Sequence, residues 1–175
     1  MRALRPVLHA AALSLALAAS PALAQKNTER DDARAIQGMI QANLAEVEAG
    51  KLASQKAQRP EVKKFAEKMI EDHGRKLEDL KSLADKKGVA APDKPSGKHE
   101  AMLKKLQAAP DDQFDRVYMS EMVQAHQQVL QDTRKVAREA QDADLKAAAQ
   151  KSAPGTEAHL KMARQIAGEK GAASK

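Results

Sequence analysis

Apolar residues recur at helical spacing in four long stretches of the chain, and this pattern limits the fold more than any other feature. It is clearest in residues 60–87, where plotting residues at about 100° each places the apolar side chains on one side of a helix. His73 lies near the centre of this apolar stripe rather than at its edge. The stripe consists of Val62, Phe65, Ala66, Met69, Leu77 and Leu80. Helices with such faces must pack against one another, so the pattern predicts an all-α fold.

The composition supports helices and excludes thiol chemistry. Aromatic residues make up 2% of the chain, and Ala, Leu, Lys, Glu and Gln, which favour helices, are abundant. The sequence contains no cysteine, which excludes disulfides, thiolate metal sites and a lipid-modified cysteine. We therefore expect helices packed by small and aliphatic side chains, with almost no strand.

The first residues have the pattern of a secretory signal peptide. Two arginines precede an apolar run at residues 7–19, which is too short to span a bilayer. The segment "SPALAQ" follows, in which Ala22 and Ala24 supply the small residues that a signal peptidase requires. We expect cleavage near Ala24, which removes residues 1–24 and delivers a periplasmic or secreted protein. No later segment is apolar enough to predict a membrane span.

The charge pattern gives little information about partners. The full chain has a net charge of +6, and two of its basic residues belong to the predicted signal peptide. Lysine and arginine alternate with acidic residues along the helices, and stacking aromatics are scarce, so a nucleic-acid partner is not expected. An unidentified protein or surface of the cell envelope is the expected partner, and the oligomeric state stays open.

Proline and glycine divide the chain into four long helices and one short helix. Two prolines and two glycines within "GVAAPDKPSGK" indicate a linker between the second and third long helices. Pro154-Gly155 predicts a kink or a short break in the last helix. The expected helices span residues 29–58, 60–87 with Gly88 as its cap, a short one at 100–107, a third long one from about Pro110, and a fourth after a turn at "QDAD".

This order of elements predicts a four-helix bundle with a long linker and a short helix between its second and third long helices. The bundle domain is expected over residues 33–168, after a flexible segment at 25–32 and before a disordered tail at 169–175. The linker and the short helix together are long enough to cross the full length of the bundle. A ferritin-like topology with one long crossover and a simple up-and-down topology are both compatible with this length.

Four polar residues are expected at one level in the middle of the bundle. If the first hairpin turns at residues 59–60, Glu46 and His73 lie opposite each other on neighbouring helices. If the second hairpin turns near Asp142, His126 lies opposite His159. Both hairpins thus give a matched pair, which predicts a polar layer at the waist of the bundle.

The acidic residues near these histidines are less well directed. Glu46 lies at the edge of its apolar stripe, and Asp72 lies at an edge beside His73. Asp115 points inward on the face of His126, but about 11 residues separate them, or roughly 16 Å along the helix axis, which is too far to share one ion. Asp115 is therefore either a hydrogen-bonding partner at the bundle end or an acid favoured in a first helical turn.

Four motifs together resemble a known bacterial family. The segments "LAEVEAGKLASQKA", "VKKFAEKMIEDH", "FDRVYMSEMVQAH" and "HLKMA" occur in this order after the signal peptide, between about residues 33 and 167. They are similar to the family of secreted proteins called domain of unknown function 4142. The resemblance implies a ferritin-like helical bundle and an extracytoplasmic location, but no settled activity. The positions that match the recurrent residues of the family are Glu46, Asp72, His73, Phe114, Asp115, Tyr118, His126 and His159.

The residue types at the waist limit the metal chemistry. Di-iron sites in ferritin-like bundles need a Glu-x-x-His pair on each of two helices, and the sequence contains no such pair. Three imidazoles with one carboxylate instead suit a single zinc, copper, nickel or iron ion. The candidate ligands are Glu46, His73, His126 and His159, with Asp72, Asp115 and Tyr118 as supporting residues.

Two functions remain open from the sequence. The histidines can form a structural polar layer in a non-enzymatic accessory or stress-related protein of the envelope, because buried polar residues also fix the register of helices. Alternatively, the layer binds a metal ion. No glycine-rich phosphate loop or nucleophile elbow is present, so a non-enzymatic role is favoured while the question of activity stays open.

Overall fold

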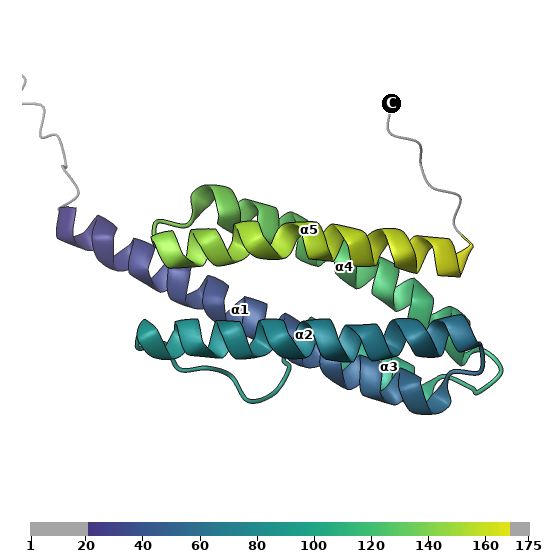
Figure 1. Ribbon diagram of the computed structural model, residues 1–175. Coiled ribbons are helices and arrows are strands. Elements are labelled where there is room, and N and C mark those ends of the chain that lie inside the picture. Colours follow the sequence, from purple (N-terminus) through teal and green to yellow (C-terminus); the bar gives the residue numbers. More distant parts are fainter. Residues whose placement is uncertain (1–20, 169–175) are drawn as a thin grey trace, which may run out of the picture.

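The computed structural model describes the backbone of residues 21–168 and the side chains of residues 29–168. All regular secondary structure in this part of the chain is helical, and two long hairpins pack against each other (Figure 1). The helices are α1 (Pro21–Lys56), α2 (Pro60–Lys86), the short α3 (Lys98–Ala108), α4 (Phe114–Glu139) and α5 (Ala143–Ala167). The predicted all-α bundle, with a linker and a short helix between its second and third long helices, is confirmed.

The linker and α3 run back along the bundle, so that α2 and α4 point in the same direction (Figure 1). Contacts at the two ends agree with this topology. Lys87, just after α2, pairs with Asp142 at the start of α5, with 2.5 Å between nitrogen and oxygen. Lys56, at the end of α1, donates to the carbonyl oxygen of Ala109, just before α4, at 3.0 Å. Of the two predicted topologies, the bundle therefore has the long crossover.

The predicted turn residues end the helices as expected. Gly88 has a φ of 64°, a conformation that glycine adopts without steric cost. The N–H of Val89 bonds to the carbonyl oxygen of Ala84 at 2.9 Å, which completes the C-terminal cap of α2. Asp142 caps α5, because its side chain accepts a hydrogen bond from the N–H of Leu145 at 2.9 Å.

Helix α5 is continuous through Pro154 and Gly155, so the predicted short break is absent, and the alternative of a kink stays a prediction. Proline in a helix removes one backbone hydrogen bond, and packing of the flanking turns can outweigh that loss. Thr156 and Leu160, which follow the proline, are both buried. The continuous helix keeps His159 on the inward face of α5.

Two other boundaries differ from those expected. Helix α1 begins at Pro21, so residues 25–32, which were expected to be flexible, lie within it. Helix α4 begins at Phe114 because residues 110–113 form a turn instead. Most of the predicted signal peptide and the predicted tail at 169–175 lie outside the described residues, and the division into domains stays a prediction.

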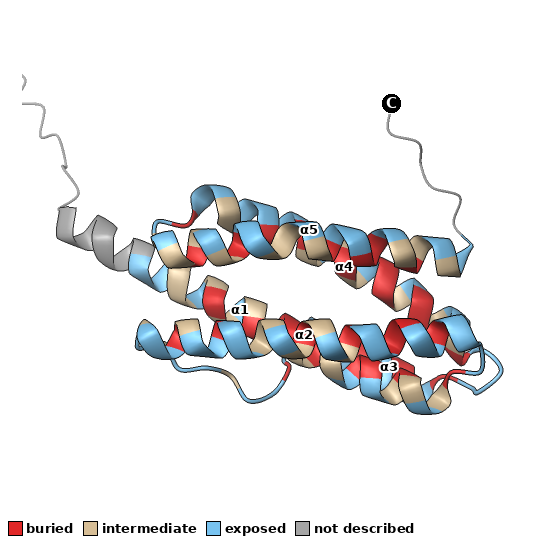
Figure 2. Ribbon diagram, viewed as in Figure 1, coloured by how far each residue is buried: buried red, intermediate tan, exposed pale blue. Residues whose placement is uncertain are grey.

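Buried side chains lie along the inward faces of the helices (Figure 2). They form two apolar clusters, a larger one around Phe65 and Tyr118 and a smaller one around Ile36 and Leu80. Every long helix also carries buried polar residues. These residues are Asn43, Glu46, His73, His126, Thr133, Thr156 and His159.

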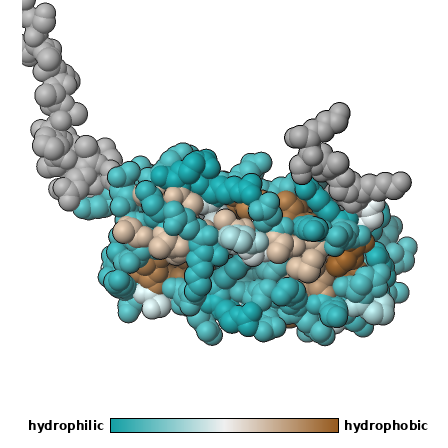
Figure 3. Space-filling view, turned by 45° about the horizontal axis from the view of Figure 1, so that its top comes forward, coloured by the Kyte–Doolittle hydropathy of each residue, from teal (hydrophilic) through white to brown (hydrophobic). Residues whose placement is uncertain are grey.

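The outer surface is mainly polar. On the face drawn in Figure 3, hydrophilic residues cover most of the area, and apolar residues form a band between them. Within the described residues, no helix combines the length and the apolar character needed to cross a membrane.

Candidate metal centre

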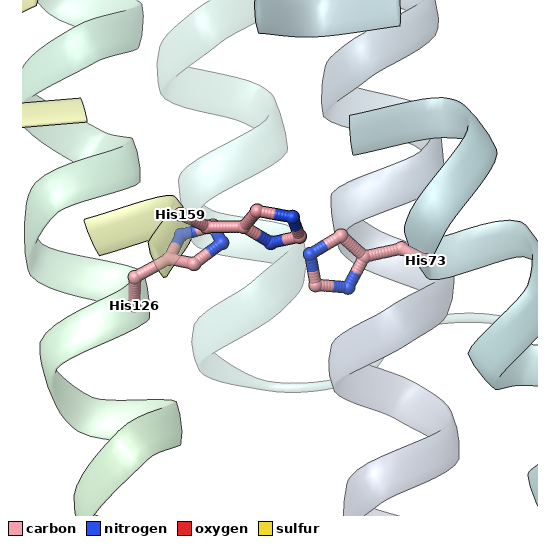
Figure 4. A group of neighbouring side chains, drawn as sticks. All are labelled: His73, His126 and His159. Atoms are coloured by element: carbon pink, nitrogen blue, oxygen red, sulfur yellow. The ribbon is translucent and has the colours of Figure 1, made fainter. Parts of the chain in front are cut away.

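Three histidines from three helices meet at the waist of the bundle. His73 lies on α2, His126 on α4 and His159 on α5, and their rings converge (Figure 4). The centroids of the rings are 5.2 to 5.5 Å apart. One nitrogen from each ring lies within 4.8 Å of the others, and all three residues are buried. The structure thus brings together the three histidines that the hairpin geometry placed at one level.

The His73 ring has a defined hydrogen position. Its Nδ1 lies 2.8 Å from Oδ1 of Asn43, on α1. The amide nitrogen of Asn43 donates to the carbonyl oxygen of Met39 at 2.8 Å, which fixes the orientation of the amide. Because Oδ1 can only accept, Nδ1 of His73 carries the hydrogen, and Nε2 keeps a lone pair.

The other two rings are fixed in the same way. Nδ1 of His126 lies 2.9 Å from the carbonyl oxygen of Met122, one turn earlier on α4. Nε2 of His159 lies 2.8 Å from a carboxylate oxygen of Asp72 on α2. Both partners are acceptors, so the hydrogen is on Nδ1 of His126 and on Nε2 of His159.

Each histidine therefore offers one free nitrogen toward the interior. These atoms are Nε2 of His73, Nε2 of His126 and Nδ1 of His159, and none has a hydrogen-bond partner among the described residues. A buried polar atom without a partner is costly, and three in one place point to a bound ligand. Metal-bound imidazoles have this arrangement, in which one nitrogen binds the ion and the other donates to an acceptor that orients the ring.

The spacing of the nitrogens is close to that of a metal site. A metal–nitrogen distance of about 2.0–2.1 Å in a tetrahedral or trigonal site requires the nitrogens to lie about 3.3–3.6 Å apart. The nitrogens lie within 4.8 Å of one another. Small rotations of the rings would thus close the group around one ion.

The surroundings keep two of the rings neutral. Burial lowers the pKa of His73 well below its usual value of 6.5, and the nearby positive charge of Lys76 lowers it further. Burial also lowers the pKa of His159 to about 4, although the hydrogen bond to Asp72 partly opposes this. Neutral imidazole is the form that binds metal ions, so both residues are ready for coordination at neutral pH.

Asp72 connects the histidine group to the surface. Burial alone would raise the pKa of its carboxyl, but hydrogen bonds from Lys68 and His159 outweigh that effect and lower the pKa. The ammonium of Lys68 lies 2.9 Å from the carboxylate. Asp72 is therefore ionised at neutral pH and orients the His159 ring, while its supporting role in a metal site stays a prediction.

Glu46 lies beside the histidines rather than among them. It is buried, and its Oε1 lies 3.8 Å from Nδ1 of His126, the nitrogen already bonded to Met122. The group of converging ligand atoms consists of the three imidazoles alone. Burial raises the pKa of Glu46, although His126 and Lys76 oppose this. Coordination of a metal ion by Glu46 stays a prediction.

The other two supporting residues have structural surroundings. Asp115 accepts hydrogen bonds from the backbone N–H groups of Gln58 at 3.0 Å and Arg59 at 2.7 Å, and so caps the start of α2. It is the hydrogen-bonding partner at the bundle end that the sequence suggested. Tyr118 is fully buried against Phe65 and Phe114, and burial, with Glu46 nearby, raises the pKa of its hydroxyl well above 10.

Three polar residues near the histidines were not predicted as part of the site. Asn43, Lys76 and Thr156 line a small cavity of about 20 Å³ next to His73 and Glu46. Asn43 lies on the inward face of α1 and could have been found by the periodicity that identified the histidines. Lys76 had no such signal, because lysine on a helix is normally solvated.

A comparison with family models identifies the chain. The model of the family described as "Domain of unknown function (DUF4142)" matches residues 17–166, which is most of the sequence. The chain belongs to this family. The resemblance drawn from the four sequence motifs is thereby confirmed, while a comparison with curated protein sequences gives no significant match.

The DUF4142 chain also has similar solved structures. A DUF305 fragment from Deinococcus radiodurans superposes with a TM-score of 0.70 at 15% identity, over 79% of this chain and 96% of the fragment. CopM in its Cu(I)-bound form gives a TM-score of 0.64 at 22% identity, over 77% of this chain and 93% of CopM. Its Cu(II)-bound form gives 0.66 at 22% identity, over 78% and 95%. At these identities the likeness concerns the fold.

Within the DUF4142 fold, the waist has the chemistry of a binding centre. Neutral imidazole nitrogens are good ligands for zinc, copper, nickel and iron. The Glu-x-x-His pairs of di-iron bundles are missing from the sequence, and the histidine group has no carboxylate that could bridge two ions. The geometry therefore suits a single ion held by three nitrogens.

Proposed function

We propose that this DUF4142 protein binds one transition-metal ion through His73, His126 and His159. The observation that carries the proposal is the set of three converging, buried nitrogens that lack a hydrogen-bond partner. Each of the three rings already donates its hydrogen elsewhere, so the free nitrogens can only accept. A cation is the ligand that satisfies three lone pairs at once.

Copper is the favoured ion. Imidazole sites generally bind divalent copper more tightly than the other first-row divalent ions, zinc included. The similar fold of CopM has been determined with Cu(I) and with Cu(II). Neutral imidazoles suit both valence states, and the site offers no thiolate that would restrict the choice. Zinc is the competing ion.

A structural polar layer is the second candidate function. Hydrogen bonds join α1 to α2 through Asn43 and His73, and α2 to α5 through Asp72 and His159. Such bonds fix the register of helices without any ion. This function leaves the three free nitrogens unexplained, and metal binding therefore accounts for more of the structure.

The predicted signal peptide supports the periplasm or the outside of the cell as the location of this metal binding. We propose a carrier or accessory role for the protein there, without catalysis. The burial of all three histidines inside the bundle supports a role in holding one ion.

The proposal is tested by measuring bound metal on protein exported to the periplasm. The chain is produced without a histidine tag, purified without chelators, dialysed and analysed by elemental mass spectrometry. We expect close to one copper or zinc ion per chain. Metal-free protein that also takes up no added copper or zinc would contradict the proposal and leave the histidines as a structural layer.

A further inference from the structure

The two hairpins of the bundle carry an internal repeat with an offset of 83 residues. The segment "MIQAN" at residues 39–43 corresponds to "MVQAH" at residues 122–126. The segment "AQRPEVKKFAEK" at residues 57–68 corresponds to "AQDADLKAAAQK" at residues 140–151, with Ala-Gln, Lys, Ala and Lys in the same places. Helix α4 therefore corresponds to α1, and α5 corresponds to α2.

The structure repeats the relationship in its contacts. Asp115 on α4 accepts from the N–H of Arg59, in the turn of the first hairpin, at 2.7 Å. Its counterpart Asp32 on α1 accepts from the N–H of Asp142, in the turn of the second hairpin, at 2.8 Å. Each hairpin thus caps the turn of the other, as in an arrangement with approximate two-fold symmetry.

Residues at the waist are related by the same approximate symmetry. The side chain of Asn43 donates to the carbonyl oxygen of Met39 at 2.8 Å, and the counterpart of Asn43, His126, donates to that of Met122 at 2.9 Å. Asn43 is therefore the first-hairpin equivalent of a histidine in the candidate metal centre.

The contact between α2 and α5 is also repeated. His159 on α5 faces Asp72 on α2 at 2.8 Å. Their counterparts are Lys76 on α2 and Gly155 on α5, and a Cβ at Gly155 would lie 3.6 Å from the ammonium of Lys76. Lys76 therefore occupies the position that corresponds to His159.

The three histidines consequently have a symmetry mate within the chain. The offset of 83 residues relates His126 to Asn43, His159 to Lys76, and His73 to Thr156. All three of these residues line the cavity of about 20 Å³ beside the centre. The cavity is about the size of one water molecule, and its wall includes the buried carboxyl of Glu46.

We propose that the waist is an arrangement for two cations, in which a metal ion occupies the histidine group and the ammonium of Lys76 occupies the symmetry-related position facing Glu46. This inference rests on the proposed function and adds that the site holds one metal ion rather than two. The ammonium nitrogen of Lys76 and Oε2 of Glu46 are both buried without a hydrogen-bond partner among the described residues.

Electrostatics explains the role of the lysine. The negative charges of Asp72 and, after it, Glu46 oppose the effect of burial on the pKa of Lys76, and the positive charge of Lys76 lowers the pKa of His73 and of His159. In a low-dielectric interior, like charges repel strongly. A second metal ion beside the ammonium is therefore unfavourable, and the lysine keeps the centre mononuclear.

The symmetry specifies the test, because Lys76→His restores the residue type found at position 159. Wild type and variant are loaded with Zn²⁺, freed of excess by gel filtration and analysed for zinc per chain. We expect one zinc ion in wild type and two in Lys76→His, and we expect Glu46→Gln in the Lys76→His background to return the value to one. A folded Lys76→His protein that binds no more zinc than wild type would overturn the inference.

Lys76→Met is the matched control and supplies a second, independent readout. Methionine fills similar space without a charge, so this variant should still bind one zinc ion, about tenfold more tightly than wild type because the repulsion has gone. An unchanged zinc affinity would also overturn the inference. If wild type binds no zinc and Lys76→His binds one ion, the symmetry-related position binds metal, and the proposed function of the three histidines is contradicted. If both proteins bind one ion, the proposed function is supported and the inference about Lys76 is contradicted.

Discussion

Replacing His73 and His126 together by alanine is expected to abolish metal binding. Only one of the three converging nitrogens then remains. Changing a residue that only orients a metal ligand lowers metal affinity by up to about 100-fold, so removing two ligands should lower it by more than that. Wild type at a metal concentration of 100 times its Kd gains about 2.7 kcal/mol in free energy of unfolding. The double variant should show no such gain, which isothermal titration and urea unfolding with and without metal would measure.

Two control variants separate coordination from general damage. His99→Ala changes a histidine on α3, outside the group, and should leave metal binding intact. His126→Phe keeps a ring next to Phe65 while removing the ligand nitrogen, and should lose metal while retaining the helical circular dichroism spectrum. Wild-type affinity in the double variant, or its loss in His99→Ala, would show that the metal binds elsewhere.

The metal-free protein is expected to lose stability as the pH falls from 6.5 toward 4. Burial lowers the pKa of both His73 and His159 in the folded state, the latter to about 4. Between these pH values the unfolded chain therefore binds more protons than the folded protein, so the stability is present above pH 6.5 and is lost on acidification. Each histidine changes the unfolding equilibrium by up to about tenfold per pH unit.

Glu46 opposes this effect and provides the internal control. Burial raises the pKa of its carboxyl above 4.5, so the folded protein holds a proton there that the unfolded chain releases. The contribution of Glu46 to stability thus grows as the pH falls. Glu46→Gln should therefore steepen the loss of stability on acidification, by up to about tenfold in the unfolding equilibrium per pH unit. Urea unfolding in EDTA at pH 6.5, 5.5 and 4.5 would measure both slopes. A wild-type stability that rises on acidification would contradict the described burial of the histidines.

Much of the fold could be predicted because local sequence signals agreed with one another. Gly88 and the "QDAD" turn mark helix ends through chemistry that acts within a few residues; Gly88 ends α2 as predicted, and of the two acids in the turn Asp142 caps α5. The meeting of the three histidines followed from counting outward from the two turns. Such counting succeeds when helices are long and continuous, since an error of one residue in the position of the turn shifts the matched residue by two positions, or only about 3 Å.

The remaining features depend on packing that local signals do not contain. Pro154 indicated a kink or a short break, and α5 is helical through it, with buried residues on both sides of the proline. Glu46 was placed opposite His73, whereas Asn43 makes that contact and Glu46 faces His126. A one-turn shift between neighbouring helices decides which of the two residues reaches the ring. The position of Lys76 in the interior is a property of the whole bundle, because only tertiary contacts bury a lysine.

X-ray absorption spectroscopy of the protein loaded with one equivalent of zinc directly tests coordination by the three histidines, because it counts and identifies the atoms around the ion. We expect three imidazole nitrogens at about 2.0–2.1 Å from the zinc, with the outer-shell scattering typical of histidine rings and a light atom as the fourth ligand. A first shell of oxygen atoms without imidazole scattering would show that the three histidines do not hold the ion.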